Sequence, residues 1–137
     1  MRTKFFNQRL DAFTLTELLI VLVIIGILVL LALPNLMPAV SDARATEAKM
    51  QLSHVAKLQK TYFMEYTRYS DNFEALGFEH NKLVDDGGTA NYRIEIVEAA
   101  EGGFKATATA VRDFDGDGVF NTWEVSQDGI PKELQKD

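Results

Sequence analysis

The chain has 137 residues and a mass of 15.4 kDa, which is enough for one small domain. With 14 Lys and Arg against 20 Asp and Glu, its formal net charge is −6, so we do not predict nucleic acid binding. The sequence contains no cysteine, which excludes a disulfide framework, a thiolate metal site and a cysteine nucleophile. His54 and His80 are too scattered for a zinc site or a catalytic pair, so we predict no catalytic residues and no enzyme.

A short basic segment, residues 1–12, precedes a long apolar segment, residues 13–33. The apolar segment contains one charge, Glu17, and as a helix it would span about 31 Å, close to the roughly 30 Å of a bilayer core. Since the cations precede the span, the positive-inside rule places the N-terminus in the cytoplasm. We therefore predict a single-pass protein of the inner membrane whose remaining residues lie outside it.

A cleaved secretory signal and a plain signal anchor are the alternative interpretations of this segment. A secretory signal has an apolar core of about 7–15 residues that ends at a small-residue site. The run from Leu18 to Leu33 is longer, and LPNLMPAV follows it. A plain anchor does not need Glu17, because a carboxylate costs roughly 2.5–3.5 kcal/mol at mid-bilayer. Glu17 lies near the cytoplasmic edge, however, where it could extend into water, so the anchor stays an alternative.

The segment AFTLTELL, from Ala12 to Leu19, with the following apolar run and Pro34, resembles the N-terminal signature of type IV pilins and of type II secretion pseudopilins. In that family a prepilin peptidase removes the basic leader just before a phenylalanine, and the new N-terminus is methylated. The resemblance implies cleavage between Ala12 and Phe13 and methylation of Phe13. Ala12 replaces the usual glycine, and because alanine is also small we expect processing to survive.

The resemblance also implies that Glu17 acts in assembly. In the family this glutamate is thought to meet the positive N-terminal amine of a neighbouring subunit inside the filament. An unpaired charge is costly in a low dielectric, so a pair that forms only on assembly favours the addition of a subunit in register. We expect Glu17→Ala to leave cleavage intact and to impair assembly.

Residues 39–66 contain neither Gly nor Pro, and several of their side chains recur at helical spacing. We predict one helix over residues 14–66, with its first half in lipid or in a filament core and its second half packed on a head. Pro34 and Pro38 each remove a backbone donor, which predicts a kink or a locally melted segment around residues 34–38. The side chains that follow the helical spacing are Leu52, Val55, Gln59, Tyr62, Phe63 and Tyr66.

Two segments, residues 91–99 and 104–111, alternate apolar and polar side chains and predict a β-hairpin. A third strand is predicted over residues 122–127, followed by a turn and a short end piece. The stretch from Tyr62 to Phe78 resembles the helix end and following loop of pilins and major pseudopilins, with Ser70 where proline is more usual.

The predicted fold class is therefore α+β and pilin-like, with a long N-terminal helix on a small antiparallel sheet of about three strands. We expect a leader peptide over residues 1–12 and a hydrophobic transmembrane or filament-core helix over residues 13–38. The globular head, residues 39–137, includes the C-terminal half of the long helix.

The loop DFDGDGVFNTWE, residues 113–124, matches the twelve-residue calcium template at its ligand positions and has Gly118 at the bend. An acidic, solvated turn is the alternative. Alternating residues before the loop indicate a strand, so we predict a structural Ca²⁺ clamp rather than a helix–loop–helix pair. Phe120 is expected to point inward as an anchor. The candidate ligands are Asp113, Asp115, Asp117, the Val119 carbonyl, Asn121 and Glu124.

The leading hypothesis is a structural subunit of a type IV family filament, a major type IV pilin that polymerises through its N-terminal helix. One alternative is the major pseudopilin of a type II secretion system, whose periplasmic filament serves protein secretion. Major pseudopilins resemble this chain in their calcium loop, but some cysteine-free pilins end in a similar acidic turn, so the loop does not separate the two. A membrane-anchored calcium-binding protein that never polymerises is the other alternative, and it predicts no cleavage before Phe13.

The resemblance implies several partners. They are further copies of the chain, the prepilin peptidase, an inner-membrane assembly platform driven by an ATPase, and minor pilins or pseudopilins. The processed protein would leave the inner membrane for an extracellular pilus or a periplasmic pseudopilus.

Overall fold

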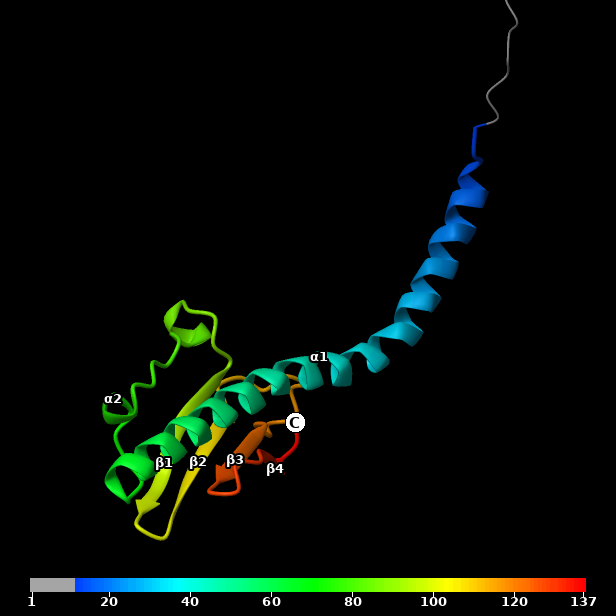
Figure 1. Cartoon of the computed structure of the whole chain (residues 1–137). Helices are drawn as coiled ribbons and strands as arrows, with labels where there is room; N and C mark the ends of the chain where they lie inside the picture. Colours follow the sequence, from blue (N-terminus) through cyan, green and yellow to red (C-terminus); the bar gives the residue numbers. More distant parts are fainter. Residues whose placement is uncertain (1–11) are drawn as a thin grey trace, which may run out of the picture. The chain divides into compact units, whose positions relative to one another are not determined.

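The computed structural model describes residues 12–137, apart from the side chains of Asn35 and Met37, and combines one long helix with a four-stranded sheet (Figure 1). Most of the predicted leader lies outside the described residues. The long helix, α1, runs from Leu15 to Tyr66 over 52 residues, within one residue of the predicted range. The fold is the expected α+β, pilin-like architecture.

The chain divides into two compact units, Met1–Leu36 and Met37–Asp137, so α1 contributes to both. In the first unit, every large apolar side chain from Leu15 to Leu33 is at least 45% exposed. Among the described residues, α1 is the one helix long and apolar enough to cross a membrane, with a mean hydropathy of 3.0 over its most apolar window. So much apolar surface needs lipid or other protein to cover it.

The second unit contains an antiparallel sheet in the order β1-β2-β3-β4. The hairpin of β1 and β2 and the third strand β3 lie within two residues of their predicted ranges. A 3-10 turn η1 and a short helix α2, which is capped by the Asn72 side chain, lie between α1 and the sheet in the chain. The bounds are Phe73–Leu76 for α2, Val84–Asp86 for η1, Tyr92–Ala100 for β1, Gly103–Ala110 for β2, Thr122–Ser126 for β3 and Lys132–Gln135 for β4.

The strand β4 corrects the prediction of a short end piece after β3 and brings the sheet from about three strands to four. Its sequence, KELQ, has no apolar alternation, and all four residues are exposed. Charged residues are common on edge strands, where they discourage pairing with other chains. A fully exposed strand buries no face, so the period-2 pattern that reveals other strands is missing here.

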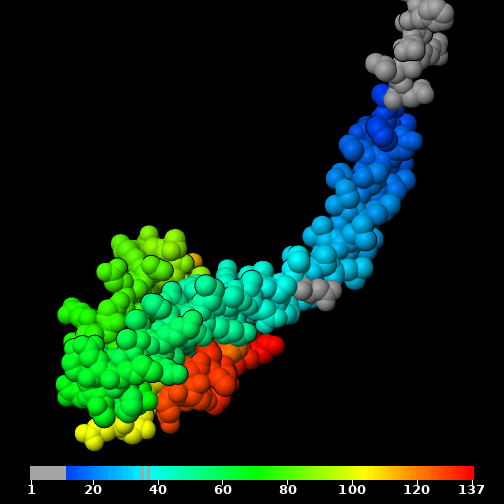
Figure 2. Space-filling view, in the orientation of Figure 1, coloured from blue at the N-terminus to red at the C-terminus, as the bar shows by residue number. Residues whose placement is uncertain are grey.

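The core lies between the second half of α1 and one face of the sheet, and Figure 2 shows the cyan and green turns of this helix beside the orange and red of β3 and β4. Alanines face each other where the helix meets the sheet: Ala45 and Ala48 on α1 and Ala106 and Ala108 on β2 are at most 3% exposed. Small side chains let backbones approach closely, so the larger residues on either side fill the remaining space. These include Leu52, Val55, Tyr92, Ile94, Phe104, Trp123 and Val125.

The predicted inner face of α1 is confirmed at Leu52, Val55 and Gln59, which are fully buried. Gln59 makes two hydrogen bonds with the backbone of the following loop. Its Nε2 donates to the Ser70 carbonyl at 2.6 Å, and the Ser70 amide donates to its Oε1 at 3.0 Å. Proline has no amide hydrogen, so serine at this position supplies a donor that the more usual residue lacks. Tyr66, at 52% exposure, is wrongly placed by the spacing.

A second buried amide, Asn121, joins three strands at the other end of the sheet. Its Oδ1 accepts from the Tyr92 hydroxyl at 2.8 Å and from Trp123 Nε1 at 2.6 Å. Its Nδ2 donates to Glu133 Oε1 at 2.8 Å and to the Gln135 carbonyl at 3.1 Å, which ties β4 to the core. Burial, with the negative charges of Glu47, Asp137 and Glu133, raises the pKa of Tyr92, so its hydroxyl stays a donor.

We expect Asn121→Ala to destabilise the head strongly. The substitution leaves the Tyr92 hydroxyl and the Trp123 indole without their acceptor, and a buried unsatisfied group costs about 1–3 kcal/mol. The free energy of unfolding, measured by denaturant titration in detergent, should fall by at least that amount. Gln135→Ala is the matched control, because its side chain is exposed and only its carbonyl contacts Asn121. Equal midpoints for the two variants would contradict this role.

Candidate functional site

The N-terminal end of α1 holds the residues predicted for processing and assembly. Ala12 and Phe13 are exposed and precede the first helical residue, so the bond between them lies outside regular structure. Glu17 is the one charged residue in the apolar run and lies in the first turn of α1. The structure therefore presents the predicted cleavage bond and the predicted assembly residue within one turn of each other.

Glu17 and Thr14 form a capping box. The Thr14 amide and hydroxyl donate to Glu17 Oε2 at 2.8 and 2.9 Å, and the Glu17 amide donates to the Thr14 hydroxyl oxygen at 3.2 Å. Such reciprocal bonds satisfy backbone donors that a helix start otherwise leaves free. The spacing T-x-x-E in the sequence carries this signal, which the sequence prediction missed. In the single chain the Glu17 carboxylate thus already has partners, and a second subunit would compete with them.

Both prolines predicted to disturb α1 lie within it, and the helix continues through Pro34 and Pro38. The locally melted segment is therefore not observed. Each proline removes a single backbone donor, and the remaining helical bonds carry the chain across. The division between the two compact units falls between Leu36 and Met37, inside the predicted range. A kink at this point stays a prediction.

The acidic loop after β2 is organised by its own aspartates. The Asp113 carboxylate accepts from the amides of Gly116 and Gly118, at 2.5 and 2.6 Å. Asp115 accepts from the Asp117 amide at 3.0 Å, and Asp117 accepts from the Val119 amide at 2.7 Å. Gly116 and Gly118 have φ angles of 85° and 87°, which side chains with a Cβ rarely adopt. The alternating D-x-D-G-D-G pattern therefore folds as a tight turn with its carboxylates drawn together.

The last residue of the chain joins this loop. The Asp137 carboxylate accepts from the Phe114 amide at 2.8 Å and from the Asp115 amide at 3.2 Å. Together with Asp113, Asp115 and Asp117, it forms a group in which one carboxylate oxygen from each residue lies within 4.8 Å of the others. Sequence reasoning missed Asp137, because β4 alone returns the C-terminus to the loop.

Two predicted ligands lie elsewhere. Asn121 is 1% exposed and uses its amide in the bonds to Tyr92, Trp123 and Glu133. Glu124 lies on β3, where the nearest cation is Lys105 Nζ at 4.0 Å. In the helix–loop–helix template the twelfth residue returns to the ion, whereas here a strand begins at Thr122 and carries Glu124 away from the loop. For Val119, the carbonyl as a ligand stays a prediction.

Contrary to the prediction, Phe120 does not point inward, and its side chain is 42% exposed. The inward position belongs to Phe114, which packs on the core with its ring 6.0 Å from that of Tyr92. The Arg44 guanidinium, which comes from α1, lies over the Phe114 ring, 4.5 Å from the ring centroid. The loop is thus anchored by its second residue, next to the strand it follows.

Electrostatic repulsion acts inside the aspartate group. The amides of Gly118 and Gly116 hold the pKa of Asp113 below its usual value, against the effect of desolvation. The Asp117 amide also acts to lower the pKa of Asp115, but desolvation and the charges of Asp117 and Asp137 outweigh it, so that pKa is raised. Grouped carboxylates offer oxygen ligands of the kind that a hard divalent cation takes at about 2.3–2.6 Å.

Both histidines have structural surroundings. The His80 ring lies against the outer edge of β1, where Nε2 is 3.0 Å from the Tyr92 carbonyl and 3.2 Å from the Ile94 amide. The His54 ring packs 5.7 Å from that of Phe78. Neither imidazole faces a nucleophile or a carboxylate among the contacts of the described residues.

Comparison with known proteins places these features in one family. The model for the prokaryotic N-terminal methylation motif matches residues 11–33, the basic-to-apolar junction that includes Phe13 and Glu17. The model for the type IV minor pilin ComP, DNA uptake sequence receptor, matches residues 34–118, from Pro34 to the acidic loop. The two matches adjoin and together cover the helix and most of the head.

Two curated relatives are type IV pilins. The type IV major pilin protein PilA of Myxococcus xanthus is 39% identical over 94 residues, which are 69% of this chain and 41% of that protein. The type IV wide pilus major component PilA4 of Thermus thermophilus is 41% identical over 64 residues, 47% of this chain and 49% of that protein. The matched segments thus span less than half of each relative. Because the ComP model covers more than half of the chain and the methylation motif adjoins it, the chain belongs to the type IV pilin family.

Proposed function

We propose that this chain is a major structural subunit of a type IV pilus, assembled through its N-terminal helix. The observation that carries the proposal is the first half of α1, where apolar side chains are exposed on all sides and Glu17 is the one charge. Such a surface requires lipid before assembly and the same helix of other subunits afterwards. The family match and the naming of both relatives as major pilus components support it.

In this proposal the unprocessed chain crosses the inner membrane once, with its N-terminus in the cytoplasm. A prepilin peptidase cleaves between Ala12 and Phe13, and Phe13 is then methylated. An inner-membrane assembly platform and minor pilins would act with it. A pseudopilus of a type II secretion system is the second candidate, because pseudopilins resemble this chain in their N-terminal signature. The matched family model is described as a DNA uptake sequence receptor, but the net charge of −6 does not favour DNA here.

Mass spectrometry of two cell fractions tests the function. Mechanically sheared surface filaments should contain a chain that begins at methylated Phe13, because a surface pilus is released by shear. The same processed mass confined to washed envelopes would instead support a periplasmic pseudopilus. An intact leader in both fractions would mean that the chain is a membrane-anchored protein that never polymerises.

Replacement of Glu17 separates its charge from its capping role. We expect both Glu17→Ala and Glu17→Gln to be cleaved normally and neither to accumulate in the sheared fraction, because both lack the charge that would pair with a neighbour's N-terminal amine. Glutamine keeps the capping box, so Glu17→Gln preserves the helix start. Filament yield is measured by immunoblot of both fractions. Wild-type yield from Glu17→Gln would show that the cap, rather than the charge, is what Glu17 provides.

We further propose that the loop binds a structural Ca²⁺ through Asp113, Asp115, Asp117 and Asp137. Grouped carboxylates supply the hard oxygens that calcium prefers, and the ion would neutralise their mutual repulsion. Asp137 replaces Asn121 and Glu124 of the predicted ligand set. The ion would then hold the C-terminus against the β2–β3 loop.

Calcium should raise the thermal stability of the protein. Ligand at 100 times its dissociation constant adds about 2.7 kcal/mol, a large share for a small domain. Circular dichroism melts in Ca²⁺, in Mg²⁺ and in chelator measure the shift. Asp113→Asn and Asp137→Asn should lose the Ca²⁺-dependent increase in Tm, whereas Glu124→Gln, on the strand, should keep it. A wild-type melt that is identical in Ca²⁺ and in chelator would contradict the metal proposal.

A further inference from the structure

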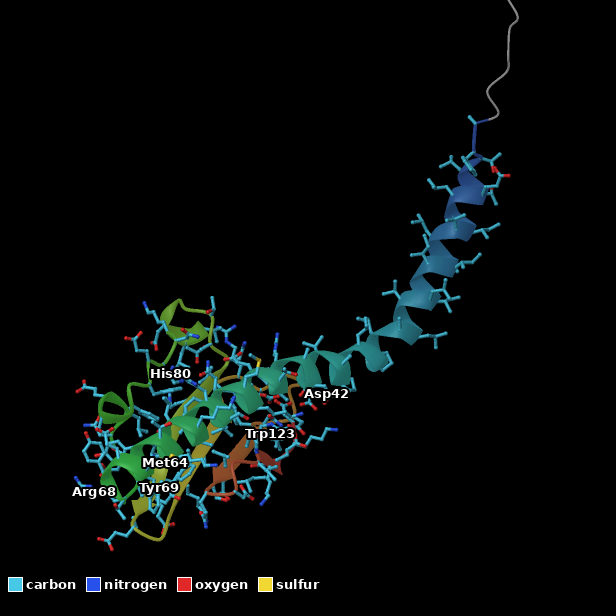
Figure 3. All side chains as sticks on the ribbon, viewed as in Figure 1. Asp42, Met64, Arg68, Tyr69, His80 and Trp123 are labelled. Atoms are coloured by element: carbon cyan, nitrogen blue, oxygen red, sulfur yellow. The ribbon has the colours of Figure 1, made fainter. Side chains whose placement is uncertain are left out.

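A groove lies at the end of the head where α1 finishes. It has a volume of about 640 Å³ and is open to solvent. Figure 3 shows Met64 and Tyr69, two of its lining residues, beside Arg68 at this end of the helix. We call it the lysine groove. Its floor and walls include Lys57, Lys60, Phe63, Met64, Tyr69 and Phe104, and the turn between β3 and β4 closes one side.

The lysine groove combines an apolar wall with two cations, and the carboxylate among its lining residues, Asp128, is paired with Lys132. The rings of Phe63, Tyr69 and Phe104 form the wall. Phe63 stacks on Tyr69 with a centroid separation of 4.7 Å, and Phe104 lies tilted against Tyr69 at 5.1 Å. Met64 is 74% exposed at its rim. Lys57 and Lys60 are exposed and have no acidic partner among the ion pairs of the described residues. A partner for this groove should therefore be acidic with an apolar tip.

Most other cations of the head are already engaged. Lys105, Arg112 and Lys132 pair with carboxylates, and the charged groups of Arg44 and Lys49 lie over aromatic rings. In a chain with a net charge of −6, the two exposed lysines of the groove attract negative charge. Charge complementarity of this kind selects and orients partners more than it adds affinity.

The same head carries a segment of the required chemistry at its opposite end. Phe104 lies at the start of β2 and lines the groove, whereas the acidic loop follows Ala110 at the end of β2, about 20 Å away along the strand. This loop exposes Asp115 and Asp117, and Phe120 lies beyond them at 42% exposure. Its three clustered carboxylates, together with that of Asp137, hold more negative charge than one divalent cation would cancel.

The acidic loop and the lysine groove are different surfaces at opposite ends of one head, so a contact between them is heterologous. Each added copy leaves one acidic loop and one lysine groove unoccupied at the ends of the assembly. The contact therefore extends an open helical filament and does not stop at a dimer. We propose that the acidic loop of one subunit, together with Phe120, docks in the lysine groove of the next subunit. The proposal rests on the filament function above and identifies the head-to-head contact within it.

Paired cysteines test this contact in filaments of the full chain, which has no cysteine of its own. The variant Met64→Cys with Phe120→Cys should, on mild oxidation of sheared filaments, give a ladder of dimers, trimers and longer covalent multimers. Each single variant has one thiol per chain and can give dimers at most. The matched control pairs Met50→Cys with Phe120→Cys, since Met50 is 69% exposed on the same helix about 21 Å from Met64 and should give no ladder.

The outcomes separate this inference from the function on which it rests. Filaments of the Met64 and Phe120 pair without a ladder, or an equal ladder from the Met50 pair, would overturn the proposed contact and leave the pilus function standing. A wild-type chain that forms no filaments would remove both. Lys57→Glu with Lys60→Glu, added to the Met64 and Phe120 pair, should abolish the ladder; a ladder that persists would contradict the charge complementarity.

Discussion

The uncovered apolar half of α1 is the constraint on which the rest of this protein depends. Its backbone bonds are satisfied within the helix, so it is compatible with hydrocarbon, but its apolar side chains are left exposed by the part of the chain that the structure describes. Lipid and the matching helices of other subunits are the two environments that remove this surface from water. Glu17 carries the one carboxylate in this apolar half, and its partners at the helix start are the amide and hydroxyl of Thr14.

In the head, a sheet of short strands stays attached to one side of a helix without a disulfide. Alanines on α1 and β2 allow close approach, and larger side chains fill the flanks. Two buried amides then fix the connections. Gln59 binds the loop that leaves α1, and Asn121, just before β3, binds Tyr92 on β1 and holds the edge strand β4. Each is costly to leave unpaired, so each favours one arrangement of its segment.

The acidic loop links these two features of the chain. It lies at the end of the sheet that Asn121 organises, and it draws in the C-terminus through Asp137. In our proposal a cation relieves the repulsion among its carboxylates, while its exposed aspartates give the head a negative end opposite the lysine groove. One short segment thus serves both the stability of a subunit and, in our proposal, the contact between subunits.

Local patterns in the sequence determined much of this protein. The apolar run, the residues around Phe13 and the period-2 alternation of the hairpin predicted α1, the pilin-like fold and three of four strands, because each depends on neighbours in the chain. The same holds for Asp113, Asp115 and Asp117, whose turn is built from bonds across a few residues.

Only the tertiary structure decided the rest. An exposed strand has no alternating pattern, so the sequence did not predict β4. Without β4, nothing in the sequence indicated that Asp137 lies beside the acidic loop. Asn121 matched a ligand position by spacing, yet the hydroxyl of Tyr92 and the indole of Trp123 required its carbonyl oxygen in the core. The lysine groove likewise combines α1, β2 and the turn after β3. Residues that meet only through tertiary packing have no regular spacing in the sequence that would predict their contact, because their proximity depends on the whole fold.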